Sequence, residues 1–169
     1  LRGASAGLVG GAKYADIKNS QCTTDIYNTN STVAAGLVGI LNLSNLEGCT
    51  LTNSIVRPNG GGIACGGIAG YAYYSIIDRS TNYGDITNYY SYTGGIAGYN
   101  TSTITYSYCL IGGNVAGTAN VGGVVGSSST NVTTSWAFYN GSLVGGHNTG
   151  NGLTYGRLLA NEVGATILP

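Results

Sequence analysis

The sequence predicts an all-β protein, a β-solenoid of five to six coils of about 28–31 residues each. Two observations carry this prediction. A Gly-apolar-small-Gly pattern recurs at near-equal intervals, and a second apolar block follows each copy at a similar distance. A third observation is that no segment has a 3.6-residue apolar stripe long enough for a helix. One such repeat cannot bury its apolar side alone, whereas stacked copies can.

The glycine pattern defines where each coil begins. Its first glycines are Gly7, Gly36, Gly67, Gly95 and Gly123, with a degenerate sixth copy at Gly152, so the intervals are 29, 31, 28, 28 and 29 residues. We expect the glycines at corners with positive φ, or where neighbouring coils approach too closely for a Cβ. The repeats therefore occupy 1–156 and leave 157–169 as a C-terminal capping or subunit-contact segment.

The second block sets the register between coils. Ile17, Leu46 and Ile77 each follow the first glycine of their repeat by 10 residues, and small shifts bring later repeats into line. The register predicts two core columns, Leu8/Leu37/Ile68/Ile96/Val124 and Ile17/Leu46/Ile77/Ile104/Val132. It also predicts two columns that contain cysteine, Ser20/Cys49/Ser80/Ser107/Ser135 and Cys22/Leu51/Asn82/Cys109/Ala137.

The composition limits the possible partners. The 169 residues include only six Lys or Arg and six Asp or Glu, and the net charge is zero. No broad field would attract nucleic acid or an anionic membrane, and no apolar run approaches the ~18 residues of a membrane span. We expect neither nucleic acid binding nor membrane insertion. The start at Leu1 without a basic and apolar leader is typical of a processed chain and equally of a fragment.

The sequence indicates no metal or cofactor. No CxxC pair occurs, and His147 has no second His or Cys nearby. The run Gly60–Gly62 lacks the Gly-Lys-Ser/Thr ending of a phosphate-binding loop. Buried thiols acting as small core side chains are one interpretation of the cysteines, and a disulfide between Cys22 and Cys49 on neighbouring coils is the other.

One pair of carboxylates has the spacing of a catalytic site. The register puts Lys18, Glu47 and Asp78 in one column on three consecutive coils, with the two carboxylates ~5 Å apart, as in retaining glycosidases. The neighbouring cations Lys18 and Arg79 favour a surface ion-pair ladder instead. We therefore predict a non-enzymatic protein without catalytic residues, and a polysaccharide-active enzyme is the lesser alternative.

Asparagine triplets are candidates for glycosylation. The pattern Asn-x-Ser/Thr occurs at Asn30, Asn42, Asn100, Asn131 and Asn140. Attached sugar would help to disperse so uncharged a protein, although abundant Asn, Ser and Thr also produce such triplets by composition alone.

Tyrosines are concentrated in the middle of the chain, where ten of the fourteen lie between Tyr71 and Tyr108. Their rings and polar tips suit protein contact or sugar stacking, and cross-coil packing is the alternative role. The candidate interface residues are Tyr71, Tyr73, Tyr74, Tyr89, Tyr90, Tyr92, Tyr99, Leu158 and Leu159.

The repeat resembles a known family. The blocks Gly36-Leu-Val-Gly, Gly67-Ile-Ala-Gly-Tyr and Gly95-Ile-Ala-Gly-Tyr-Asn, each followed by an Ile/Leu-x-x-Ser/Cys segment, are similar to GLUG repeats. These repeats occur in bacterial surface and secreted proteins, including adhesin-like and IgA-peptidase-type proteins. The resemblance covers roughly residues 6 to 155 and implies a repetitive β fold, an extracellular or cell-surface location and no active site. The first copy departs from the pattern, with Gly11 where an aromatic residue often falls, and the sixth copy lacks its closing glycine.

The ends of the repeat array suggest a function. The repeats begin within six residues of Leu1, and the segment from Arg157 to Pro169 is a short apolar tail. Such an uncapped stack suits end-to-end polymerisation. We expect a structural subunit of an extracellular filament or surface layer, with itself as main partner. The alternative is the repeat region of a larger cell-surface adhesin that binds a glycan or a surface protein of a host or neighbouring cell.

Overall fold

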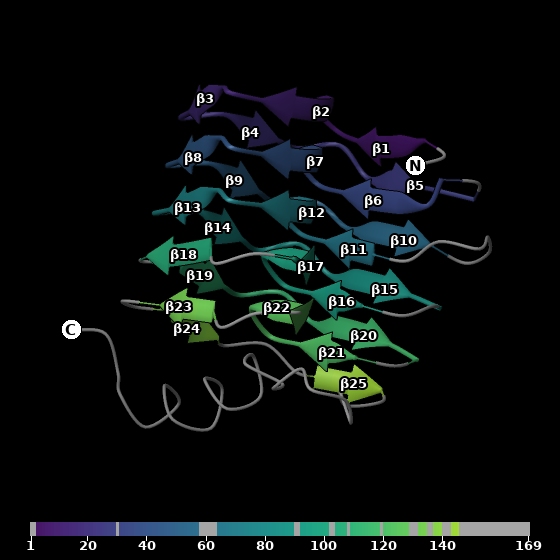
Figure 1. Ribbon diagram of the computed structural model, residues 1–169. Helices are drawn as coiled ribbons and strands as arrows, with labels where there is room; N and C mark the ends of the chain where they lie inside the picture. Colours follow the sequence, from purple (N-terminus) through teal and green to yellow (C-terminus); the bar gives the residue numbers. More distant parts are fainter. Residues whose placement is uncertain are drawn as a thin grey trace.

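The computed structural model is a solenoid of parallel strands (Figure 1). It describes residues 3–29, 31–57, 64–89, 92–101, 104–107, 109–118, 120–128, 132–134, 137–139 and 143–145. These residues form 25 strands and no helix. Five consecutive strands make one coil, and β6 begins the second coil beneath β1.

Each of the five sheets takes one strand from every coil. The β1 sheet contains β1 (Ala4–Ala6), β6 (Val33–Ala35), β11 (Ala64–Gly66), β16 (Thr93–Gly94) and β21 (Val121–Gly122). The β2 sheet contains β2 (Val9–Lys13), β7 (Val38–Asn42), β12 (Ala69–Tyr73), β17 (Ala97–Asn100) and β22 (Val125–Ser128). The β3 sheet contains β3 (Asp16–Lys18), β8 (Asn45–Glu47), β13 (Ile76–Asp78), β18 (Ile104–Ser107) and β23 (Val132–Thr134). The β4 sheet contains β4 (Gln21–Cys22), β9 (Thr50–Leu51), β14 (Thr81–Asn82), β19 (Cys109–Ile111) and β24 (Ala137–Tyr139). The β5 sheet contains β5 (Ile26–Tyr27), β10 (Ile55–Arg57), β15 (Ile86–Asn88), β20 (Val115–Gly117) and β25 (Leu143–Gly145).

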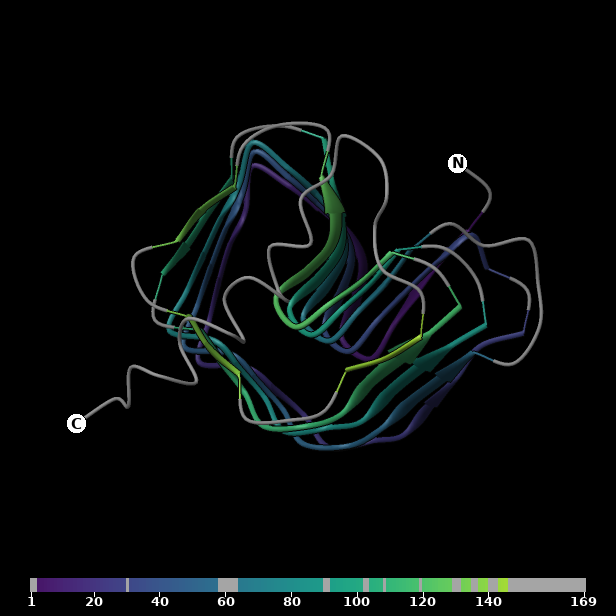
Figure 2. The same ribbon diagram turned by 90° about the horizontal axis from the view of Figure 1, so that it is seen from below.

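The predicted fold class is confirmed. Viewed along the stack, equivalent strands of successive coils superimpose (Figure 2). The four intervals between five stacked strands correspond to about four turns, slightly fewer than the five to six coils expected. The sixth copy at Gly152 and the segment 157–169 lie outside the described residues.

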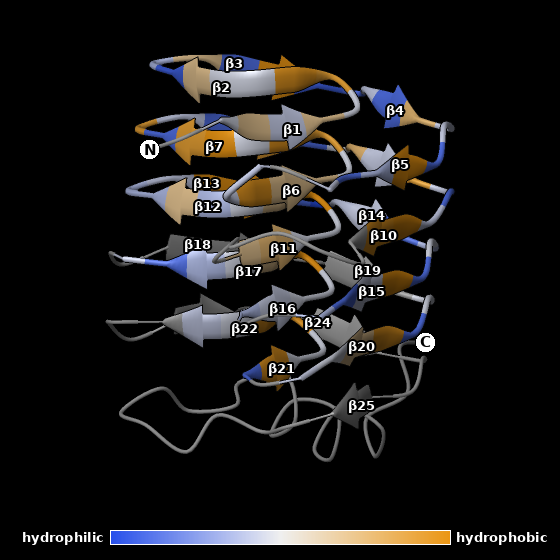
Figure 3. Cartoon of the chain, turned by 90° about the vertical axis from the view of Figure 1, so that its right-hand side faces the viewer, coloured by the Kyte–Doolittle hydropathy of each residue, from blue (hydrophilic) through white to orange (hydrophobic). Residues whose placement is uncertain are grey.

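The first predicted core column is confirmed. The backbone N–H of Leu8 donates to the carbonyl of Leu37, which stacks in turn on Ile68, Ile96 and Val124. From Leu37 to Val124 these side chains are fully buried, and they belong to one continuous apolar core. Hydrophobic stretches also recur at one position of the first, second and fourth coils, along β5, β10 and β20 (Figure 3). Periodic burial of the same position is what holds the coils together.

The second predicted column is correct for three coils and wrong at the fourth and fifth. Ile77 pairs with Leu46 above it, but the next partners are Tyr106 and Thr134, not Ile104 and Val132. Ala72 pairs with Asn100 and Ile76 with Thr105, so the fourth coil has one extra residue at this corner. The prediction aligned apolar residues and so chose Ile104, two positions before the true partner, because the two-residue period of a strand fits both positions.

The same shift changes the cysteine columns. Cys22 stacks on Leu51 and Asn82 as predicted, but Ile111 follows in place of Cys109. Cys109 precedes Leu110, the partner of Thr81, so it continues the column of Ser80. Ser107 pairs with Asp78 and does not belong to that column.

The repeat glycines are required by the close approach of neighbouring coils. A Cβ on Gly36 would lie 2.1 Å from the carbonyl oxygen of Gly67, and one on Gly67 would lie 2.2 Å from that of Gly95. Of the two roles expected for the repeat glycines, the structure shows the close approach of coils and not positive φ. Among the described glycines, only Gly3 and Gly48 have positive φ.

The corners are instead formed mostly by other residue types in the left-handed region. One corner stacks Tyr14, Leu43 and Tyr74, and a second stacks Asn19, Gly48 and Arg79. At the second corner a small donor follows the left-handed residue. Ser20, Cys49 and Ser80 donate to the carbonyls of Lys18, Glu47 and Asp78, at 2.9, 3.4 and 3.0 Å. This local hydrogen bond stabilises each tight turn.

Candidate functional site

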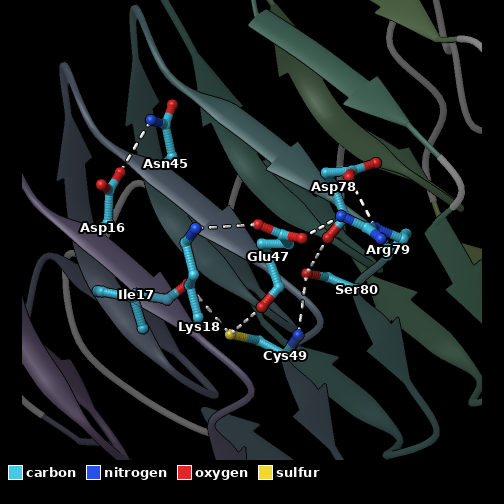
Figure 4. Close-up of polar contacts among 9 residues, drawn as sticks. All are labelled: Asp16, Ile17, Lys18, Asn45, Glu47, Cys49, Asp78, Arg79 and Ser80. Carbon is cyan, nitrogen blue, oxygen red and sulfur yellow. Dashed lines mark hydrogen bonds and ion pairs between the residues drawn. The ribbon is translucent and has the colours of Figure 1, made fainter.

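The predicted column of charges is present on the β3 sheet (Figure 4). Lys18 Nζ lies 3.4 Å from Glu47 Oε2. The guanidinium of Arg79 pairs with Glu47 and also donates from Nε to Asp78 Oδ2 at 2.9 Å. Glu47 and Asp78 therefore share one guanidinium, because Arg79 follows Asp78 at the corner and its side chain turns back toward the coil above.

This ladder is a surface feature. The side chains of Lys18 and Arg79 are 56% and 60% exposed. The hydrogen bond that Arg79 donates to Asp78, and then the charge of Glu47, raise the pKa of Arg79. Exposed ion pairs of this kind contribute little to stability, because water and salt screen them. The arrangement links coils one to three, and both carboxylates already have cationic partners.

The other acidic residues also bridge coils. Asp25 and Asp85 share a column with Ser54 between them. Asp25 Oδ1 accepts the backbone N–H of Ser54 at 3.0 Å, and Asp85 Oδ1 accepts that of Asn114 at 2.8 Å. Each carboxylate thus receives a backbone donor of the next coil. In the described part of the chain, no group of three or more His, Cys, Asp or Glu is placed to hold a metal ion.

The cysteines act as small interior side chains. Cys22 and Cys49 are free thiols and are buried, so the disulfide between them does not form in the structure. The Cys22 thiol points to the carbonyl of Thr24, whereas the Cys49 thiol points to the carbonyls of Glu47 and Ile17. Burial raises the pKa of Cys49. Cys65 is also buried in the core.

The glycosylation candidates differ in how far their side chains are buried. Asn100 is fully buried, so its side chain is not accessible for attachment of sugar to the folded protein. Asn42 is half-buried at the end of β7. Asn30, Asn131 and Asn140 lie outside the described residues.

Four of the predicted interface residues form a cluster that we call the tyrosine surface: Tyr71, Tyr73, Tyr92 and Tyr99. Tyr71 stacks on Tyr73 with ring centroids 5.6 Å apart and meets Tyr99 edge to face at 5.2 Å. Tyr92 stacks on Tyr99 at 4.7 Å. The rings pack outside the main core, with Val33 and Ala64. Tyr71 is only 7% exposed, so it forms the buried base of the cluster, while the other three are half-buried.

The remaining interface candidates are separate from this cluster. Tyr74 and Tyr89 are exposed. Tyr89 borders a pocket of about 170 Å³ that is also lined by Thr87, Asn88, Ala116, Gly117 and Thr118. Tyr90, Leu158 and Leu159 lie outside the described residues.

Sequence reasoning missed a second apolar feature, the corner ridge of Tyr14, Leu43 and Tyr74. Hydrogen bonds from Tyr14 N to Asn42 O and from Leu43 N to Tyr73 O stack these three residues on consecutive coils. Their side chains are 73%, 42% and 67% exposed. A signal was available, because each of the three follows the first glycine of its repeat by seven residues.

The corner ridge is costly in two ways. Its residues have φ of 54°, 49° and 45°. The left-handed conformation costs roughly 1–2 kcal/mol for a residue with a Cβ, and Asn, Asp and Gly tolerate it best. Large apolar side chains there also remain in water. Neither property helps the chain to fold.

Comparison with known proteins gives no relative. No protein-family model matches the chain, and neither the curated proteins nor the solved structures include a match. No helix able to cross a membrane occurs in the described part of the chain.

Proposed function

We propose that this chain is a non-enzymatic structural subunit of an extracellular filament or surface layer, and that it assembles by stacking its coils end to end. One observation carries the proposal. Among the described residues, β1, β2, β3, β4 and β5 are the terminal strands of their sheets, so on one face of the first coil five parallel edges have no described partner. Open strand edges are templates for another strand.

The side chains of the first coil support this view. Leu8 is 46% exposed, whereas Leu37, Ile68 and Ile96 below it in the same column are fully buried. Ile17 and Ile26 are likewise only partly buried against the core. A further coil placed on this face would bury Leu8 as the first coil buries Leu37, and a fully buried leucine contributes roughly 1.5–3 kcal/mol.

The opposite end suits the same contact. Among the described residues, β21, β22, β23, β24 and β25 terminate the same five sheets on the other side. Because all pairs are parallel, the last coil of one copy and the first coil of another would meet in the register that already joins coils within the chain. A head-to-tail contact that does not close into a ring produces a filament.

A non-enzymatic role fits the charged ladder. Glu47 and Asp78 bind the same guanidinium, which a catalytic acid and nucleophile would have to release. The extracellular location rests on the resemblance of the repeats to GLUG repeats and on the low content of charged residues.

The tyrosine surface favours a second candidate, the repeat region of a larger cell-surface adhesin. Three half-buried tyrosines on coils three and four give contact area with polar tips. In that protein the open edges would be covered by further coils of the same chain.

Electron microscopy and light scattering of the purified protein test the proposal. We expect filaments or a concentration-dependent increase in mass, which Leu8→Lys abolishes by placing a charge at the stacking face. Leu43→Lys is the matched control, because Leu43 has similar exposure but lies on the side of the solenoid. A protein that stays monomeric at high concentration would refute self-assembly and favour the adhesin.

A further inference from the structure

The corner ridge uses residue types that its backbone does not favour. At the neighbouring corner, the left-handed positions hold Asn19, Gly48 and Arg79, which include the two types best suited to positive φ. At the corner ridge, all three coils hold large apolar residues. The neighbouring corner thus shows that this fold can form such a turn with residues that tolerate positive φ better. Tyr14, Leu43 and Tyr74 share a large, exposed side chain that does not help the chain to fold. This shared property points to a role in binding.

The ridge has a fixed repeat along the solenoid axis. Its residues follow the strand spacing of ~4.8 Å, so Tyr14 and Tyr74 are about 10 Å apart with Leu43 between them. One coil corresponds closely to the advance of one sugar ring in an extended polysaccharide. Two coils correspond to a disaccharide unit. Tyr14 and Tyr74 are thus spaced to stack on alternate rings of such a polymer.

Polar side chains flank the ridge on both sides. Lys13 and Asn42 precede its first two residues, and Asp16 and Asn45 follow them. Asn45 Nδ2 donates to Asp16 Oδ1 at 2.9 Å, and Lys13 Nζ lies 5.0 Å from the ring centre of Tyr14. The charges of Lys13 and Asp16 balance, so the ridge offers hydroxyl-binding groups without a net charge.

The backbone excludes one competing occupant. The N–H groups of Tyr14 and Leu43 already donate to carbonyls of the next coil. A peptide strand therefore cannot pair with the backbone N–H groups of these two residues, and recognition along the ridge depends on side chains. The balanced charge likewise gives no attraction to nucleic acid or to an acidic polysaccharide.

We propose that the corner ridge binds a neutral, extended polysaccharide that lies along the solenoid axis. Tyr14 and Tyr74 stack on alternate sugar rings, Leu43 contacts the ring between them, and Lys13, Asp16, Asn42 and Asn45 bind hydroxyl groups at the sides. This inference is independent of the proposed self-assembly, because the ridge lies on the side of the stack and not on its end.

The test uses variants that separate binding from folding. Tyr14→Asn with Tyr74→Asn removes both rings and puts a residue tolerant of positive φ at each position, so the melting temperature should stay the same or rise. Tyr27→Asn with Tyr83→Asn is the matched control, since Tyr27 and Tyr83 are 70% and 55% exposed at other places. Tyr74→Trp keeps an aromatic platform.

The probes are insoluble cellulose and chitin in pull-down assays, and cellohexaose and chitohexaose in calorimetry, with polygalacturonate as the acidic comparison. We expect the wild type to bind at least one neutral polymer better than polygalacturonate. The Tyr14/Tyr74 variant should lose at least tenfold in affinity, and the control and Tyr74→Trp should retain it.

Any of the following results would overturn the proposal: no binding to any of these neutral polymers, equal binding by the Tyr14/Tyr74 variant, or a preference for polygalacturonate. Loss of binding on changing Tyr73 and Tyr99, with the ridge variant unaffected, would move the site to the tyrosine surface and also overturn it. Micrographs of the same samples report self-assembly separately, so the two proposals can fail one at a time.

Discussion

The side-chain amide of Asn82 donates a hydrogen bond of 3.0 Å to the carbonyl oxygen of Gly95 inside the core. Its Oδ1 accepts the backbone N–H of Gly84 at 2.9 Å. Asn82 is fully buried and lies in a column with Cys22 and Leu51, where the coils above have less polar side chains. The amide thus joins the third coil to the first glycine of the fourth.

Replacing this amide should weaken the stack between those coils. Asn82→Leu introduces the residue that stands above it at position 51, but it removes both hydrogen bonds. We expect a loss of about 2–4 kcal/mol in the free energy of unfolding, because buried polar groups without partners are costly. Urea denaturation measures the change.

The control for this prediction is Asn45→Leu, which removes one exposed hydrogen bond to Asp16. It should change stability by less than about 0.5 kcal/mol. If Asn82→Leu proved as stable as the wild type, the core would not depend on this amide.

The close approach of coils at Gly98 gives a second prediction. A Cβ at this position would lie 2.6 Å from the backbone N of Cys65 and 2.9 Å from its carbonyl oxygen, and neither atom belongs to a flexible side chain. Gly98→Val should therefore prevent folding or lower the melting temperature by more than 10 °C. Tyr99→Val beside it should have a smaller effect, because Tyr99 is half-buried outside the main core.

A matched glycine provides the control for Gly98. Gly11 occupies the same sheet in the first coil, and a Cβ there would meet only the carbonyl oxygen of Ile40 at 4.0 Å. Gly11→Ala should fold normally, whereas Gly98→Ala should not. Similar melting temperatures for these two alanine variants would contradict the tight approach.

The repeat made most of the fold predictable, because a stack repeats one local solution. The positions of Gly67 and Gly95 alone were enough to pair Ile68 with Ile96. The predicted register is wrong where one residue is inserted, between Asn100 and Thr105. Ile104 and Tyr106 are two positions apart, so the two-residue period of a strand fits both and does not show which of them pairs with Ile77.

The candidate sites were predicted less completely than the fold. The ladder from Lys18 to Asp78 followed from register alone. The corner ridge did not, because glycine was expected at positive φ and Leu43 is a poor choice for that conformation. The burial of Tyr71 was also missed, since its place outside the main core depends on packing between the β1 and β2 sheets.

The corner column of Ser20, Cys49 and Ser80 predicts how Cys49 responds to substitution. Cys49→Ser restores the donor that Ser20 and Ser80 use to bind the carbonyl two residues before them. Stability should change by less than about 1 kcal/mol. Cys49→Val removes the donor and adds a branched side chain at a tight turn, so we expect a loss of about 1–3 kcal/mol in chemical denaturation. A serine variant less stable than the valine variant would contradict this role.

Tyr71 predicts a specific loss of stability in alkali. Burial, and then the neighbouring rings of Tyr73, Tyr99 and Tyr92, raise the pKa of Tyr71 from 10.0 to about 12. Below pH 10 the phenol is protonated in the folded and the unfolded chain, and its contribution to stability is fully present. Between pH 10 and pH 12 the unfolded chain releases a proton that the folded chain retains, so the free energy of unfolding falls.

Tyr71→Phe should remove this part of the pH dependence. The ring still packs on Tyr73 and Tyr99, but position 71 no longer loses a proton on unfolding. The free energy of unfolding should therefore fall less steeply between pH 10 and pH 12, by the contribution of about one proton. Urea denaturation at half-unit steps from pH 8 to 12 measures the slope, and ultraviolet absorbance of phenolate follows the titration. Parallel curves for Tyr71→Phe and wild type would show that the Tyr71 phenol ionises equally easily in both states.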